Sequence, residues 1–125
     1  MPSPLRIQAG RRAYSHLAAH GLRAADIAVI PAAAGGPKGL ILSQLDAWLF
    51  GSWLPSAPRQ RSLLGASIGA WRMAAACQPD AARGFAQLAE LYCQQRYSAK
   101  PSEHEVTQAC QQLLHDWLAG QEQAM

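Results

Sequence analysis

Two short apolar segments, each running straight into small residues, restrict the folds open to this chain more than any other feature. They span residues 27–30 and 62–64, and the first is rich in β-branched side chains. Such runs are typical of strands buried on both faces of a parallel sheet. A helical pattern lies between them at about residues 40–53, with one apolar face made by Ile41, Leu45, Trp48 and Leu49. The sequence therefore predicts a right-handed β-α-β unit with parallel strands.

Helical patterns flank this unit on both sides, so the fold class expected is α/β, a parallel β-α-β core with flanking helices. Gly21 suits the left-handed C-cap of the first helix, and Ser102 with Glu105 forms a capping box at the start of the last. Two strands make a marginal parallel sheet, so we expect residues 1–125 to be a single partial domain. Four helices are expected besides the central one, at about residues 8–20 and 68–77, from Asp80 onward, and from Ser102 to Gly120.

Composition indicates a packed globular chain, part of whose apolar surface is not needed for its own core. Half of the 125 residues are hydrophobic and 15% are charged, against roughly 25% charged in typical soluble proteins. Part of the apolar surface is therefore available to a second copy, a membrane surface or further chain, and we leave self-association and peripheral membrane contact open. The net charge of +3 comes from scattered basic residues without interleaved aromatics. Nucleic-acid binding is accordingly not expected.

The cysteines favour a reducing compartment. Cys77, Cys93 and Cys110 are odd in number and far apart, without the spacing of a disulfide framework or a zinc site. Cys93 and Cys110 fall on apolar helical faces, where we expect them to be buried. Neither a signal peptide nor a membrane-spanning segment is recognisable. These features predict a cytoplasmic protein that holds no metal.

The sharpest chemical motif is a GxSxG sequence formed by Gly65, Ala66, Ser67, Ile68 and Gly69, between the second strand and the next helix. A tight strand-to-helix turn holds such a serine in strained dihedral angles and projects its hydroxyl above the sheet edge. Gly65 and Gly69 would let the backbone turn and the helix pack closely. The alternative is an ordinary β-α turn, in which a buried Ser67 hydrogen-bonds to backbone.

A second motif follows the first strand, and it consists of Ala34, Gly35, Gly36, Pro37, Lys38 and Gly39. Paired glycines before a helix leave backbone amides free to bind a phosphate or the oxyanion of a tetrahedral intermediate. A Walker A loop is excluded because Gly39 follows Lys38 where Ser or Thr is required. Carboxyl ends of parallel strands meet at one edge of a sheet, so both motifs should lie together. An oxyanion loop beside Ser67 explains this arrangement best.

The order of these motifs resembles the opening of patatin-like phospholipases, in which a GGGx[KR]G loop and a GxSxG elbow follow successive strands. The resemblance covers most of the chain from Gly10 to Ser98 and implies the N-terminal part of a three-layer patatin-like fold. It also implies hydrolysis of a lipid acyl ester without a cofactor. Ser67 would be the nucleophile of a Ser-Asp dyad, with the oxyanion and substrate bound by Gly35, Gly36, Pro37, Lys38 and Gly39.

The chain departs from the family at two points. Ala34 replaces the first glycine of the loop, and no Asp-Gly pair is present to supply the dyad aspartate. The general base that would take the Ser67 proton is therefore not recognisable. Two alternatives stay open: an acyltransferase built on the same serine elbow, and a catalytically inactive or interaction domain.

Overall fold

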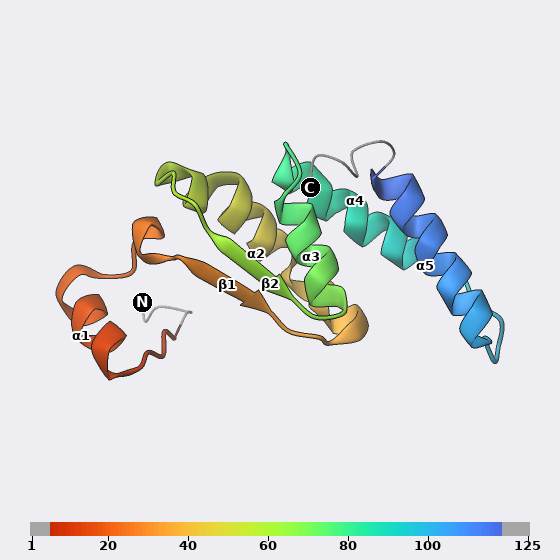
Figure 1. Cartoon of the computed structure of the whole chain (residues 1–125), viewed down its shortest axis with the longest axis horizontal. Coiled ribbons are helices and arrows are strands. Elements are labelled where there is room, and N and C mark those ends of the chain that lie inside the picture. The colour runs from red at the N-terminus through yellow and green to blue at the C-terminus, as the bar shows by residue number, and fades with distance from the viewer. Residues whose placement is uncertain (1–5, 119–125) are drawn as a thin grey trace.

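Two parallel strands lie side by side in the computed structural model, which describes residues 6–118 (Figure 1). Strand β1 (Val29–Ala32) pairs with β2 (Ser62–Gly65) in a register that sets Ala32 opposite Gly65. The predictions of mixed α/β structure and of parallel strands are confirmed. Strand β1 begins two residues later than expected. The amide of Ile27 donates to the Ala24 carbonyl at 3.3 Å and so closes a short helical turn before the strand.

The segment between the strands is more broken than the single helix expected there. A 3₁₀ segment begins at Gly36, four residues before the expected start. Pro37 lies in its first turn, where the missing amide hydrogen of a proline costs no intrahelical hydrogen bond. Gly51 lies in a π-helical turn, and Pro55 opens a further 3₁₀ turn. The segment comprises η2 (Gly36–Leu42), α2 (Ser43–Trp48), η3 (Leu49–Trp53) and η4 (Leu54–Ser56).

One face of the sheet is open. Val29 and Leu64 share a face because Leu64 pairs with Pro31, two residues along from Val29. Their side chains are 53% and 58% exposed, whereas Ala32 on the opposite face is buried. The expectation that the first strand is buried on both faces is therefore wrong. Burial on both faces requires a second layer over Val29 and Leu64, and no described residue supplies it.

The hydrophobic core lies among the helices that follow β2. These are α3 (Ile68–Ala76), α4 (Ala81–Gln94) and α5 (Glu103–Leu118), while α1 (Arg11–His20) and η1 (Ala24–Asp26) precede the sheet. Figure 1 shows α5 against α4, at the end of the molecule opposite α1. The core side chains are Ala75, Ala81, Phe85, Leu88, Leu113 and Trp117. Cys93 is exposed and Cys110 partly buried, so the expectation of two buried cysteines is wrong for Cys93.

Capping residues set the helix ends largely as expected. Gly21 has a φ of 70° and its amide donates to Leu17, and Asp80 accepts from the Arg83 amide at 3.0 Å. At α5 only half of the capping box forms. The amide of Glu105 donates to Ser102 Oγ at 3.1 Å, but the Glu105 carboxylate turns to another residue. The predicted end at Gly120 lies outside the described residues.

The partner of the Glu105 carboxylate is Ser98, in the loop before α5. The backbone amide and the hydroxyl of Ser98 donate to it at 2.7 and 2.8 Å. These two hydrogen bonds lower the pKa of Glu105. Glu105 thus fixes the loop to the first turn of α5. Within residues 6–118, no helix combines the length and the apolar character that crossing a membrane requires.

Candidate functional site

Ser67 occupies the turn between β2 and α3 in a conformation that side chains rarely adopt. Its φ is 54° and its ψ is −128°, and among the described residues other than glycine it alone has a positive φ. That combination lies outside the left-handed helical region as well as the common ones, and it costs of order 1–3 kcal/mol. Ser67 is exposed, which contradicts the alternative of a serine buried in an ordinary turn. A strained, exposed serine at the N-cap of a helix is the geometry of a nucleophile elbow.

Two glycines allow this turn because backbone passes where a side chain would stand. A Cβ on Gly65 would lie 2.5 Å from the Ala70 nitrogen, across the turn. A Cβ on Gly69 would lie 2.6 Å from the carbonyl carbon of Ala32 and 2.8 Å from the Ala33 oxygen. Real Cβ atoms do not approach backbone so closely. Both glycines are therefore required sterically, as the sequence indicated.

The loop after β1 turns at a glycine with a positive φ and is exposed on both sides of it. Gly36 has a φ of 55°, which favours glycine, and no other atom lies near its missing side chain. Gly35 and Lys38 are exposed on either side. The 3₁₀ turn that begins at Gly36 engages the Lys38 amide with the Gly35 carbonyl. Since Pro37 has no amide hydrogen, the amides left for an anion are those of Gly35 and Gly36. Of the predicted binding residues, Pro37 can only shape the loop.

Three contacts bring the loop and the elbow together at the carboxyl end of the sheet. The amide of Ala66 donates to the Ala32 carbonyl at 3.1 Å, which extends the ladder up to Ser67. Gly69 lies against the backbone of Ala32, as above. Gly39 lies against Ile68, since a Cβ there would be 2.8 Å from Ile68 Cγ2. Figure 1 shows η2 and the start of α3 at the same end of the strands.

A buried ion pair behind the site was not anticipated from the sequence. Arg72 Nε donates to Asp46 Oδ2 at 2.6 Å and Arg72 Nη2 donates to Oδ1 at 2.8 Å. The two side chains are 12% and 3% exposed. The hydrogen bond to the Asp46 carboxylate raises the pKa of Arg72. An acid in one apolar helix and a base in the next were the only sequence signal for this pair.

Each aspartate already has a partner elsewhere, so no Ser-Asp dyad forms among the described residues. Asp46 binds Arg72, and Asp80 caps α4. Asp26 accepts from the Arg23 amide and lies 3.0 Å from His16 Nε2, and Asp116 accepts from Gln112.

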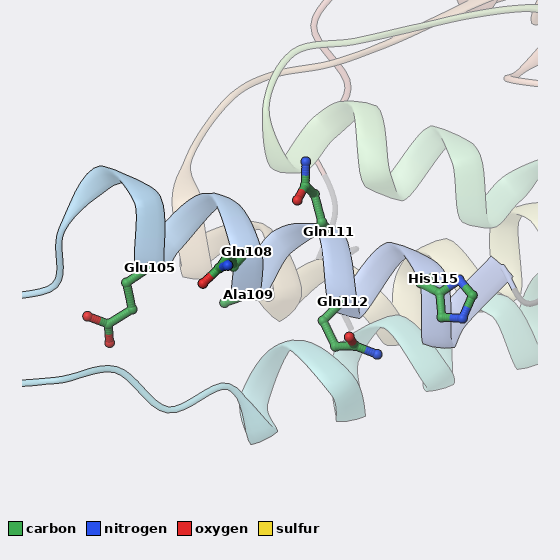
Figure 2. A pocket seen from close by; sticks show the side chains of 6 residues that line it. All are labelled: Glu105, Gln108, Ala109, Gln111, Gln112 and His115. Atoms are coloured by element: carbon green, nitrogen blue, oxygen red, sulfur yellow. The ribbon is translucent and has the colours of Figure 1, made fainter.

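His115 of α5 does not replace the missing aspartate. Trp117 of α5 shares the core with Ala75, eight residues along α3 from Ser67. Eight residues of helix span about 12 Å, so this part of α5 meets the end of α3 remote from the elbow. His115 lines a hollow of about 670 Å³ along α5 instead. The side chains labelled in Figure 2 come from α5 alone and point in several directions, without convergence on one point.

Comparisons with known proteins add no identification. The chain matched no protein family, no curated protein and no solved structure. The functional assignment therefore rests on the geometry around Ser67. No group of three or more His, Cys, Asp or Glu side chains suited to a metal ion is present in residues 6–118.

Proposed function

We propose that this chain carries the nucleophile and oxyanion loop of a patatin-like serine acyl hydrolase, within a three-layer fold of that type. The strained backbone of Ser67 is the observation that carries the proposal. Strain persists only where the surroundings impose it, and it clusters at functional sites. Here the hydrogen bonds from Ala66 to Ala32 and from Ala70 to Ser67 hold the turn on both sides, and Gly65 and Gly69 leave room for its close backbone. An ordinary β-α turn would need neither the strain nor the two glycines.

In the proposed reaction, Ser67 Oγ attacks the carbonyl carbon of an ester while its proton passes to a base. The carbonyl oxygen becomes an oxyanion, which the amides of Gly35 and Gly36 would stabilise. Collapse of the intermediate breaks the bond to the alkoxide, which takes up the proton and departs as the alcohol. Ser67 is then acylated. Attack by water then releases the carboxylic acid and restores the serine. No cofactor takes part in these steps.

Apolar side chains beside the loop support a lipid acyl ester as the substrate class. Ile41 is 81% exposed three residues after Lys38, and Leu42 and Leu45 are 40% and 42% exposed. An acyl chain lying over them would remove apolar surface from water, which contributes roughly 25 cal/mol for each Å². The same side chains would suit contact with a membrane surface.

Covalent labelling with a fluorophosphonate tests the proposal. With its aspartates engaged elsewhere, the chain should react slowly, and imidazole as an external base should accelerate the reaction. Mass spectrometry should locate the adduct on Ser67, with Ser67→Ala as control. Exposed Ser56 and Ser102 serve as internal references. Ser67 labelling no faster than theirs would refute a formed nucleophile site.

A non-catalytic interaction domain is the second candidate. The engaged aspartates and the open face at Val29 and Leu64 favour it. It predicts a folded chain whose Ser67 stays unlabelled with or without imidazole.

A further inference from the structure

The buried pair of Asp46 and Arg72 joins the two parts of the proposed site from behind. Asp46 lies in α2, seven residues after Gly39 at the end of the loop motif. Arg72 lies in α3, five residues after Ser67. The pair therefore ties the helix that continues the oxyanion loop to the helix that begins at the nucleophile. Along the chain, α2 is connected to α3 only through the π and 3₁₀ turns and β2, so the ion pair is a direct link that the backbone does not supply.

Stability alone gives little reason for such a pair. Removing two charges from water costs several kcal/mol for each ion, and apolar residues of similar size are often at least as stabilising. What the pair supplies is geometry. A guanidinium and a carboxylate joined by two parallel hydrogen bonds fix both separation and relative orientation. Leucine and methionine side chains in the same place would let the two helices shift relative to one another.

The site needs such control of geometry. An oxyanion donor must lie within a few tenths of an ångström of the position where charge develops. The sheet ladder fixes the elbow to β1 through Ala66 and Ala32. On the helical side, the loop contacts the elbow through Gly39 and Ile68. This is a van der Waals contact, which does not fix the relative orientation of the two segments. The Asp46–Arg72 pair provides the directional constraint on that side.

We propose that Asp46 and Arg72 are positioning residues that hold the oxyanion loop in register with Ser67. That the pair serves catalysis rests on the proposed function. The coupling of the two helices can be measured even in an inactive chain. Neither side chain takes part in the chemistry.

The test replaces the pair by apolar residues in Asp46→Leu/Arg72→Met and measures amide hydrogen exchange without substrate. We expect exchange at residues 40–46 and 69–72 to rise about tenfold or more by local opening, while the core of α4 around Phe85 keeps its protection. Fluorophosphonate labelling of Ser67 should slow at saturating reagent, with no change in melting temperature. Unchanged exchange at both segments would overturn the inference, and so would an equal rise in α4, which indicates a general structural role.

A second variant keeps the test decisive if the double variant does not fold. Arg72→Lys retains the charge but loses the two-pronged geometry, so the same local rise in exchange is expected at a smaller magnitude. No rise in Arg72→Lys would equally overturn the inference. Absence of Ser67 labelling in the unmodified chain counts against the proposed function only, because the exchange result does not depend on activity.

Discussion

Replacing Ser67 by glycine should stabilise the chain relative to replacing it by alanine, which reverses the usual order. Glycine alone adopts a φ of 54° with a ψ of −128° without steric cost. Alanine keeps the Cβ that creates the strain. Both alanine and glycine lack the serine hydroxyl. The comparison of Ser67→Gly with Ser67→Ala therefore isolates the backbone conformation from the loss of the side-chain oxygen.

The magnitude follows from two opposing terms. Strain at such angles costs about 2 kcal/mol, the middle of the range for sparsely populated regions. Glycine forfeits about 1 kcal/mol through the greater freedom of its unfolded chain. The difference, about 1 kcal/mol in favour of glycine, corresponds to about 4 °C in melting temperature for a chain of this size.

Thermal unfolding followed by circular dichroism measures both variants under one condition. We expect Ser67→Gly to melt about 4 °C above Ser67→Ala, with fluorophosphonate labelling lost in both. If Ser67→Gly melts below Ser67→Ala, as at an ordinary helix position, the turn is unstrained in solution. The argument from strain to function would then fail.

Two further predictions concern Gly69 and Glu105. In Gly69→Ala the new Cβ would lie 2.6 Å from the Ala32 carbonyl carbon, so overpacking should cost about 1–3 kcal/mol in chemical denaturation. Gly51→Ala, whose Cβ would make an ordinary 3.4 Å contact, is the matched control, and equal effects of the two would refute the steric role. The pKa of Glu105 lies below its ordinary 4.5 because Ser98 donates to the carboxylate. Its contribution to stability is therefore complete above that ordinary pKa and is lost as the pH falls through the lowered one. Melting temperatures of Glu105→Gln should fall less steeply with acid than those of the unmodified chain, and identical slopes would contradict the assignment.

Local signals in the sequence predicted the parts of the fold that depend on neighbouring residues. The two strands, their parallel pairing and the turn at Ser67 follow from short apolar runs next to small residues. The steric demands at Gly65 and Gly69 were also accessible, because a strand-to-helix turn needs small residues at those positions. Each of these features is decided within a few residues of chain, where backbone geometry leaves few alternatives.

Features that depend on distant packing could not be predicted in the same way. Val29 and Leu64 read as buried strand residues, yet their exposure depends on how many layers cover the sheet. The apolar pattern after Lys38 suggested one helix, whereas the structure has four short helical segments of differing pitch between residues 36 and 56, three of which contain Pro37, Gly51 or Pro55. The pairing of Asp46 with Arg72 joins residues 26 positions apart, and no local rule connects them.

The geometry of the proposed nucleophile does not depend on the base that would serve it. Ser67 is held by contacts made entirely within the described residues, through two glycines, the Ala66–Ala32 hydrogen bond and the Gly39–Ile68 contact. Such a serine should keep its geometry whether or not a carboxylate faces it. If Ser67 is a nucleophile, the lack of a base should leave it slow, because nucleophile and base act as a unit and a proposed oxyanion loop alone supplies only charge stabilisation. Acceleration by imidazole is the signature that distinguishes a complete nucleophile lacking a base from a turn that only resembles one.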